Sequence, residues 1–486
     1  MMNSVAQLSP RLQTVANFVR PGARLADVGT DHAYLPIALL QEAKITFAIA
    51  TDLREGPLAQ AAAHARQSGV GAALALRCGD GLAPVRAEEA DDIVIAGMGG
   101  ELIAKILAAA PWVRDPGKRL ILQAMSSAED LRRFLVRESF YIEQEVAVRD
   151  GGRVYTVICA HFSTTEHNAR FPGFDYIGEL HPQASPEAQE FAERQLRHLS
   201  KIYFGQQTRG DFAAAQTRAE IQEIAARTGG HPVVFAGEIY DEIDRFAPFS
   251  TAMSFDNPGL LAGSRDRIVQ KALVALDITP EVVREAASKG AELIISHHPV
   301  IFHPLRALPA AHPAYLLAQH QLTAICAHTN LDMAVGGVNT CLARALGVAN
   351  TAPFVYDNGN PEALLGALPQ PQSPEAFADD VKCRLGCGRV EWVRGARPVQ
   401  RVALCGGAGG DLLEQAAAAG ADAFVTGEVR HHQLLQARAL GITLVGGGHY
   451  RTERVVLEPL CARLRPAFPA VHFLVSERET DPSEWI

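Results

Sequence analysis

The sequence lacks long apolar runs, a paired cysteine pattern and a basic excess. Its apolar stretches are short and broken by charges, and none approaches the roughly 20 residues of a membrane-spanning helix. The N-terminal segment has no basic start followed by an apolar core, which argues against a secretion signal. Eight cysteines without a disulfide framework indicate reduced thiols. These absences predict a cytoplasmic protein without a membrane segment.

Charge and composition are those of an ordinary globular protein. Hydrophobic residues make up 48% and charged residues 20%, and the formal net charge is -9. Neither half, divided at residue 228, has more Lys and Arg than Asp and Glu. Binding of RNA would therefore depend on a local basic patch.

A domain border is predicted near residue 228. The segment TGGHP at 228–232 favours a turn or linker, and it follows two helical stretches, Pro186–Phe204 and Gly210–Arg227. Strands and helices alternate on both sides of it. We therefore expect two α/β domains, residues 1–228 and 229–486.

A strand, a glycine turn, a helix and a second strand are predicted near the N-terminus. Arg24–Val28 is a strand that leads into Gly29, and a helix is expected over Ile37–Ala43. The second strand, Thr46–Ala50, ends at Asp52. This order is typical of nucleotide-type folds, in which an acid after the second strand binds ribose hydroxyls.

The first loop has too few glycines for a dinucleotide, whose pyrophosphate needs close approach of the backbone. S-adenosylmethionine, a cofactor without phosphates, fits better. Its amino group can meet Asp27 and Asp31, its ribose Asp52, and its adenine amino group the loop at Asp80. A further strand runs into a glycine turn at Gly97. The alternative is that these are only tight turns of a sheet protein, but four of them in order favour a cofactor site.

Five segments resemble the bacterial tRNA (adenine-22-N1) methyltransferase family: ARLADVGTDHAYLP, TDLREGPL, GDGLAPV, DDIVIAGMGGELI, and LILQ followed by LR. The resemblance covers residues 11 to about 225. It implies a class I, Rossmann-like methyltransferase domain with a C-terminal helical extension over about 180–228, with S-adenosylmethionine as cofactor and tRNA as substrate. The residues expected to bind the cofactor are Asp27, Gly29, Asp31, His32, Asp52, Leu53, Asp80, Gly81, Gly97 and Met98. The catalytic residues stay unassigned.

One segment departs from that family. Members usually have Pro-Asn after the LILQ strand, whereas this chain has Ala124-Met125. A polar amide there would help to orient the target base, and neither side chain here replaces its hydrogen bonds. Cofactor binding is expected to be intact, whereas catalysis on tRNA is open. Two interpretations, a phosphate-facing patch or a solvated helix face, apply to four basic residues of the extension: Arg194, Arg197, Lys201 and Arg209.

Two adjacent histidines follow a short apolar run in the second half. Leu293–Ile295 is predicted as a strand, with His297 and His298 at its carboxyl edge, where open α/β sheets build their sites. An isolated pair of this kind is more often a surface dipeptide. A second strand, Leu322–Cys326, is followed by His328 and then Asp332.

A third strand, Thr443–Val445, precedes His449 and Glu453. If a helix begins there, these side chains four residues apart lie on one face. Five nitrogen and oxygen ligands exceed what one tetrahedral ion needs. They suit two divalent ions, drawn from Zn, Fe, Mn or Co, with Asp332 as the bridge. Such pairs polarise a water and a phosphoryl or carbonyl oxygen.

Six segments of this half resemble the GTP cyclohydrolase 1 type 2 homologue family: FSTAMSFDNPGLLAGS, ISHHPVIFHP, AHTNLDMAVGGVN, VALCGGAGG, TGEVRHH and GGGHYRTE. The resemblance implies a dinuclear metal centre in a hexamer. The metal ligands that it implies are His297, His298, Asp332, His449 and Glu453. His328 would support the ligands, and Gly427–His432 would line the cavity. Thr351–Arg397 leaves room for a small inserted segment at most.

Two functions are compatible with these features. The first is a bifunctional enzyme that methylates tRNA adenine at N1 and carries a metal-dependent, hydrolase-like centre for a small-molecule or phosphoester substrate. The alternative is a non-catalytic or regulatory protein that binds S-adenosylmethionine and metal ions and forms an oligomeric scaffold. Ala124-Met125 favours the second, and the full ligand set favours the first.

Overall fold

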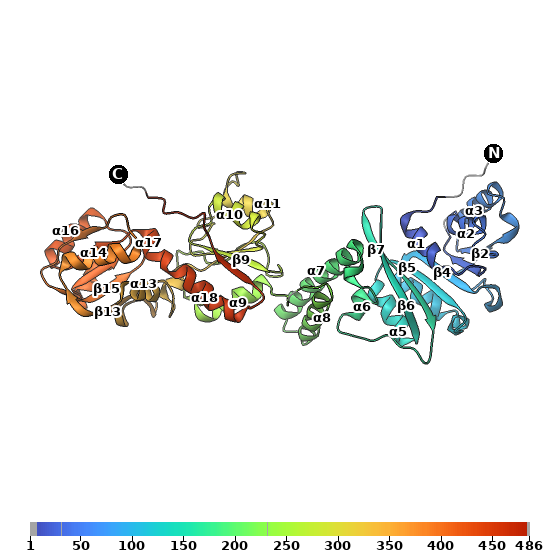
Figure 1. The fold of residues 1–486 in the computed structure, drawn as a ribbon, viewed down its shortest axis with the longest axis horizontal. Helices are drawn as coiled ribbons and strands as arrows, with labels where there is room; N and C mark the ends of the chain where they lie inside the picture. Colours follow the sequence, from blue (N-terminus) through green and yellow to red (C-terminus); the bar gives the residue numbers. More distant parts are fainter. Residues whose placement is uncertain (1–6, 31, 231, 484–486) are drawn as a thin grey trace. The chain divides into compact units, whose positions relative to one another are not determined.

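The computed structural model describes residues 7–30, 32–230 and 232–483. It divides into two compact units, Met1–Pro232 and Val233–Ile486 (Figure 1). Asp31 and His231, both used in the sequence-based predictions, lie outside the described residues. Each unit has its own sheets and its own hydrophobic core.

The first unit is built on a seven-stranded sheet in the order β3-β2-β1-β4-β5-β7-β6. β1 to β5 are parallel, and β7 and β6 are antiparallel additions at one edge. The strand order reverses between β1 and β4, and α/β proteins bind ligands at the carboxyl ends of strands at such a point. The strands are β1 Arg24–Val28, β2 Phe47–Asp52, β3 Leu74–Cys78, β4 Asp92–Gly99, β5 Arg119–Ser126, β6 Phe140–Asp150 and β7 Arg153–Phe162.

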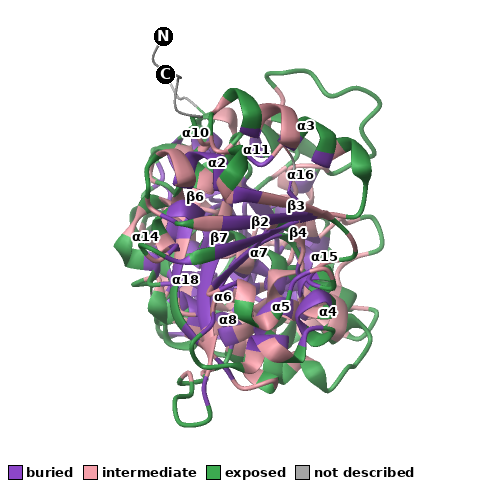
Figure 2. Ribbon diagram, turned by 90° about the vertical axis from the view of Figure 1, so that its right-hand side faces the viewer, coloured by how far each residue is buried: buried purple, intermediate pink, exposed green. Residues whose placement is uncertain are grey.

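Both faces of this sheet are buried, which explains the nearly continuous apolar runs of its strands. Ile93 and Ile95 of β4 belong to one hydrophobic cluster, whereas Val94 between them belongs to another on the opposite face. Figure 2 shows the strands as a mainly buried layer. The helices around the sheet are α1 Pro10–Phe18, α2 Tyr34–Gln41, α3 Glu55–Gln67, α4 Gly100–Ala108 and α5 Ala128–Arg137.

A helical extension follows the sheet, in agreement with the sequence-based prediction. It contains α6 Phe174–Ile177, α7 Pro186–Thr208 and α8 Ala213–Arg227. The hydroxyl of Ser185 caps α7 by accepting a hydrogen bond from the backbone N–H of Ala188, and Pro186 occupies the first turn, where its missing N–H costs nothing.

The second unit contains two sheets. The first has the order β18-β9-β10-β11-β8 and the second the order β12-β13-β15-β16-β17-β14. Most of residues 351–397 form β12, β13, α14 and β14, so this segment belongs to the second sheet and its cover rather than to an inserted domain. The strands are β8 Gly259–Ala262, β9 Lys271–Ala275, β10 Leu293–Ser296, β11 Thr323–Cys326, β12 Ala349–Asp357, β13 Asn360–Gln372, β14 Glu391–Val393, β15 Val399–Cys405, β16 Ala423–Thr426, β17 Thr443–Gly446 and β18 His472–Val475.

The helices of the second unit pack on these sheets through buried apolar residues. Leu293 and Ile295 of β10 belong to one cluster and Ile294 to another, so helices cover this sheet on both faces as well. The helices are α9 Ala236–Phe246, α10 Pro280–Ser288, α11 Pro313–Gln319, α12 Thr329–Met333, α13 Val338–Leu346, α14 Pro374–Leu385, α15 Leu413–Ala418, α16 His431–Leu440, α17 His449–Glu453 and α18 Leu457–Ala467.

The predicted strand that runs into a glycine turn within residues 92–100 corresponds to β4. It continues to Gly99 because β5 keeps pairing with it, across an irregularity between Ala96 and Met98. Gly97 supplies the positive φ of +87° that this irregularity requires.

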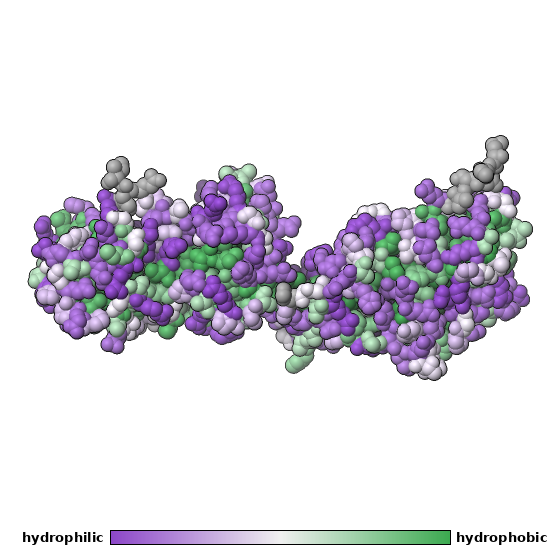
Figure 3. All heavy atoms as spheres, viewed as in Figure 1, coloured by the Kyte–Doolittle hydropathy of each residue, from purple (hydrophilic) through white to green (hydrophobic). Residues whose placement is uncertain are grey.

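Within the described residues, the helices are too short or too polar to cross a membrane. Figure 3 shows a mainly hydrophilic surface on this face, with apolar residues gathered on part of the second unit.

A buried ion pair joins the sheet of the first unit to its extension. The side chains of Arg132 on α5 and Glu145 on β6 are both 0% exposed, with Nη2 and Oε1 2.5 Å apart. Arg132 Nη1 also donates to the carbonyl oxygens of Asp175 and Tyr176 at 2.9 and 3.0 Å.

We expect Arg132→Leu to lower the free energy of unfolding of the first unit by about 3–5 kcal/mol, because it leaves the carboxylate of Glu145 buried and unpaired. The matched control is Arg133→Leu, which removes exposed ion pairs and should cost about 0–1 kcal/mol. Urea unfolding of the full chain, with hydrogen exchange of peptides from the first unit, measures both. Equal losses in the two variants would contradict the assignment.

Candidate functional site

The predicted cofactor residues of the first unit come from the carboxyl ends of four neighbouring strands. Asp27 lies near the end of β1, Asp52 ends β2, Asp80 and Gly81 follow β3, and Gly97 lies in β4. Backbone bonds hold these ends together: Gly29 N–H donates to Thr51 O at 2.8 Å and Gly79 N–H donates to Asp52 O at 3.0 Å. The structure therefore brings these residues to the switch point of the sheet.

Asp27 is the buried acid of this group, with a relative exposure of 7%. Burial raises the pKa of its carboxyl from 3.8 to about 6, against a smaller opposing effect of Thr30. In the described part of the chain, no Lys or Arg forms an ion pair with it. A buried carboxylate in this state favours a cationic ligand.

The loops after β1 and in β4 fit each other through Gly29 and Met98. Gly29 has a φ of +72°, and a Cβ there would lie 2.0 Å from the terminal methyl carbon of Met98. The N–H of Gly97 donates to Oε1 of Gln123 at 3.1 Å, and Arg11 Nη1 donates to the same oxygen at 2.5 Å. These contacts fix the shape of the site's floor.

The remaining predicted cofactor residues lie around this floor. Asp52 Oδ1 accepts a hydrogen bond from Arg54 N–H at 2.8 Å, and Leu53 is 69% exposed. The carbonyl of Gly81 accepts from Thr51 Oγ1 at 3.0 Å, whereas Asp80 is exposed. His32 has a φ of +63°. The His32 ring lies 5.5 Å from each of two neighbouring rings, those of Tyr34 and His64.

The segment that departs from the resembled family continues β5 to Ser126. Gln123 is fully buried and Ala124 nearly so, whereas Met125 is 45% exposed. A cavity of about 320 Å³ opens beside Met125, between the end of β5, β7 and α7. Its other lining residues include Arg153, Tyr155, Phe191 and Arg194. Of these, sequence reasoning named only Arg194, because strand β7 carried no recognisable motif.

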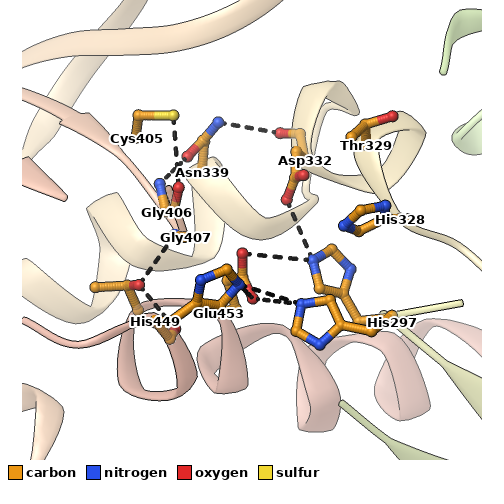
Figure 4. A network of polar contacts seen from close by, with 12 residues as sticks. His297, His328, Thr329, Asp332, Asn339, Cys405, Gly406, Gly407, His449 and Glu453 are labelled. Carbon is orange, nitrogen blue, oxygen red and sulfur yellow. Dashed lines mark hydrogen bonds and ion pairs between the residues drawn. The ribbon is translucent and has the colours of Figure 1, made fainter. Parts of the chain in front are cut away.

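The second unit assembles the predicted metal-binding residues at one place. His297 and His298 follow β10, Asp332 lies on α12, and His449 and Glu453 lie on α17. Figure 4 shows His297, Asp332, His449 and Glu453 pointing toward one another. Candidate ligand atoms lie within 4.8 Å of one another in each of three overlapping groups: His297, Asp332 and Glu453; His298, His449 and Glu453; His297, His298 and His328.

The first two histidines are oriented through Nδ1. His297 Nδ1 donates to the carbonyl of Ala327 at 2.9 Å, and His298 Nδ1 lies 2.9 Å from Oδ1 of Asp277. Both rings therefore present Nε2 to the cluster. Metal-binding histidines are held in this way by a carbonyl or carboxylate.

The other two histidines are held by carboxylates. His328 Nδ1 lies 2.7 Å from Oδ1 of Asp256, and His449 Nδ1 lies 2.7 Å from Oε1 of Glu428. His328 was predicted to be a supporting residue, but its ring is in the cluster, with centroids 5.2 and 5.4 Å from those of His297 and His298. It adds a sixth possible ligand.

Glu453 is the central carboxylate. Its Oε2 lies 3.0 Å from Nε2 of His298 and 3.0 Å from Nε2 of His449, and its Oε1 lies 3.8 Å from Nε2 of His297. Sequence reasoning gave the bridging position to Asp332. In the structure, the two oxygens of Glu453 face different histidines, and Asp332 lies closest to His297. A Cβ on Gly407 would lie 2.1 Å from Oε1, so the glycine after β15 makes room for this carboxylate.

Burial and hydrogen bonding shift the pKa values of this cluster in opposite directions. Burial lowers the pKa of His298, but hydrogen bonds with Asp277 and Glu453 outweigh it and raise that pKa to about 10. For His449 the same balance, with Glu453 and Glu428, raises the pKa to about 9. Burial raises the pKa of Asp332. Hydrogen bonds from the histidines overcome burial and depress the pKa of Glu453.

One nitrogen of the cluster is buried without a hydrogen-bond partner. It is Nε2 of His297, which lies 3.5 Å from Oδ1 of Asp332. The Nε2 atoms of His298 and His449 lie 3.3 Å apart. Cations would satisfy all of these nitrogens and the carboxylates together. The donor set therefore fits metal ions.

Sequence reasoning missed most of the groups that orient the histidines. Asp277 follows β9 at its carboxyl end, and Asp256 lies in the segment FDNPG, so both had a recognisable position. Glu428 was included only as part of the expected cavity lining. Arg430, His431 and His432 of that lining are exposed.

Comparisons with known proteins agree with this division into two units. Residues 235–482 match the family model Duf34/NIF3 (NGG1p interacting factor 3), and residues 8–158 match a methyltransferase domain model. The GTP cyclohydrolase 1 type 2 homolog of Streptococcus pneumoniae is 33% identical over 242 residues, which cover 48% of this chain and 90% of that protein. The tRNA (adenine(22)-N(1))-methyltransferase of Bacillus subtilis is 34% identical over 227 residues, 46% of this chain and 94% of that protein. The crystal structure of the B. subtilis m1A22 tRNA methyltransferase TrmK is 32% identical, covers 46% of this chain and 97% of its own, and has a TM-score of 0.38.

Asp27→Asn is expected to stabilise the first unit at pH 7.5 by up to about 3 kcal/mol. The pKa of the carboxyl is about 6 in the folded chain and 3.8 as its ordinary value, so ionisation disfavours the folded state as the pH rises through this interval. The gain should be small near pH 4.5 and complete above pH 7. Urea unfolding at several pH values, with half-buried Asp52→Asn as the control, measures it. A gain that does not grow with pH would refute this explanation.

Proposed function

The chain belongs to the Duf34/NIF3 family over residues 235–482 and carries a methyltransferase domain that resembles tRNA m1A22 methyltransferases, and on this premise we propose that it is a two-site enzyme. The first site would methylate N1 of a tRNA adenine with S-adenosylmethionine. The second would hold two divalent metal ions and hydrolyse a small-molecule or phosphoester substrate. The observation that carries the first proposal is the buried Asp27, and the one that carries the second is the Glu453 cluster.

Asp27 fits the methionine ammonium of S-adenosylmethionine. The carboxyl is buried at the switch point, and a cation beside it would relieve the cost of its ionisation. Asp52 would bind the ribose, the Gly81 loop the adenine, and the contact between Gly29 and Met98 would shape the floor. His32, Leu53, Asp80 and Gly97 complete the proposed set; Asp31 lies outside the described residues.

The cavity beside Met125 is the proposed place for the target nucleotide. Arg153 and Arg194 offer positive charge for phosphate, and Tyr155 offers an aromatic ring for a base. When bound, S-adenosylmethionine supplies an electrophilic methyl group, and N1 of adenine needs positioning more than acid–base help. The side chains of residues 124–125 carry no amide. This weakens the orientation of the target base, but it does not remove a general acid or base that the reaction requires.

Methyl transfer from labelled S-adenosylmethionine to bulk bacterial tRNA is expected to be detectable but weak. Asp27→Asn should reduce it at least tenfold, because the charge-assisted contact with the ammonium is lost. Met125→Asn should increase it, because an exposed amide is restored beside the target base. Asp332→Ala, in the other unit, serves as the control and should leave it unchanged. Absence of incorporation while the chain still binds the cofactor would overturn the methyltransferase proposal.

The proposed metal ligands are His297, His298, His328, Asp332, His449 and Glu453. Glu453 would contribute both of its oxygens, which face different histidines, and Asp277, Asp256 and Glu428 would orient the imidazoles. Two ions polarise a water and a phosphoryl or carbonyl oxygen, which supports hydrolysis as the reaction class. Imidazole and carboxylate ligands accommodate Zn, Fe, Mn or Co.

We expect about two metal ions per chain after loading and gel filtration, measured by elemental analysis. Asp332→Ala should lose at least one ion, because its carboxylate belongs to one of the three overlapping groups. The exposed Glu414→Ala on the same unit is the control and should keep both. A single ion per chain that survives Asp332→Ala would rule out the dinuclear centre. A screen of phosphoesters and nucleotides with the loaded chain then identifies the substrate.

A second candidate is a regulatory protein that binds S-adenosylmethionine and metal ions as an oligomeric scaffold. Ala124-Met125 supports this candidate, because the amide usual in the resembled family is missing. The hexamer implied by the resemblance would form through the second unit. The methyl-transfer measurement separates this candidate from the first.

A further inference from the structure

Two exposed phenylalanines lie beside the histidine cluster of the second unit. Phe255 is 60% exposed and Phe302 is 38% exposed. Their ring centroids are 6.3 Å apart, and the Phe302 centroid is 6.4 Å from that of His328, with an interplanar angle of 78°. A continuous path of rings therefore leads from solvent to the cluster.

The loop that carries Phe255 is fixed by the same group that orients His328. Asp256 binds Nδ1 of His328 through Oδ1, and its Oδ2 accepts from the N–H and the hydroxyl of Thr329 at 3.0 and 2.6 Å. Thr329 Oγ1 also accepts from the N–H of Met253 at 2.9 Å. Phe255 therefore has a rigid connection to a candidate ligand.

The second loop is tied to the first. Asn257 Nδ2 donates to the carbonyl of Ile301 at 2.6 Å, and Ile301 directly precedes Phe302. Phe302 also lies within five residues of His297 and His298 along the chain. The loops that carry both phenylalanines are thus held by short polar contacts, while parts of the two rings stay exposed to solvent.

We propose that Phe255 and Phe302 form a stacking platform for a planar heteroaromatic ring of the substrate of the metal centre. A ring face attracts a heteroaromatic base whatever its substituents, whereas the cluster would take the polar part of the same molecule. This inference rests on the proposed function of the second unit and narrows its substrates to compounds such as nucleotides.

The test compares GMP with ribose 5-phosphate on the metal-loaded full chain. Both probes carry the sugar and phosphate, and only GMP carries a base. Saturating S-adenosylhomocysteine occupies the proposed cofactor site of the first unit. Calorimetric titration should show GMP binding at least tenfold more tightly than ribose 5-phosphate. Phe255→Leu and Phe302→Leu, which keep apolar bulk but remove the ring face, should each weaken GMP binding about tenfold and leave ribose 5-phosphate unchanged.

Three controls keep the result interpretable. Phe302→Tyr keeps the ring and should retain the affinity for GMP, and thermal unfolding identifies variants that fail to fold. Phe212→Leu replaces a phenylalanine that is 99% exposed on the first unit and should have no effect. Light scattering reports the oligomeric state of each variant.

Equal binding of the two probes, or unchanged GMP binding by both leucine variants, would overturn the platform. A leucine variant that changes the oligomeric state but not GMP binding would assign these rings to a contact between copies and overturn it too. Metal content is measured on the same samples. Two bound ions without discrimination between the probes refute the platform alone, whereas a chain that binds no metal refutes the centre and the platform together.

Discussion

The burial of carboxylates at the carboxyl ends of parallel strands is the constraint on which both units depend. A carboxylate out of water costs several kcal/mol unless a partner compensates it. Asp27 has little compensation within the first unit, so its pKa rises to about 6. Glu453 is compensated by imidazoles, and its pKa falls. The first unit leaves its buried carboxylate largely uncompensated, whereas the second surrounds its buried carboxylate with imidazoles. Both arrangements favour positively charged ligands.

The positions of these acids follow from strand order. Parallel strands deliver their carboxyl ends to one edge, and the residue after each strand is placed there whatever its type. In the second unit, β10 and β11 are parallel neighbours in one sheet, whereas β17 belongs to the other sheet. The candidate ligands follow the carboxyl ends of these three short buried strands, and the cluster forms where the ends from the two sheets meet.

Much of this was predictable from sequence because it depends on pattern. The apolar runs before His297 and His449 predicted that these side chains follow strands. The four-residue spacing of His449 and Glu453 predicted that these two side chains share one face of a helix. The positions of individual atoms were not predictable. Whether Asp332 or Glu453 stands between the histidines depends on how α12 and α17 pack. His328 enters the cluster because Asp256, more than seventy residues earlier, turns its ring. The point at which the fourth strand ends was not predictable, because its pairing with β5 beyond Gly97 leaves no signal in its own residues.

The backbone conformation of Gly29 limits the evolutionary paths open to this chain. A side chain at residue 29 would be strained by the φ of +72°, whereas the methyl carbon of Met98 at 2.0 Å is the end of a flexible side chain that can move aside. A smaller residue at 98 would only widen the space, and the backbone would still disfavour any residue with a Cβ. No single compensating substitution at 98 therefore opens the position. Drift in this domain can alter the end of β5, as residues 124–125 illustrate, while the turn at Gly29 stays fixed.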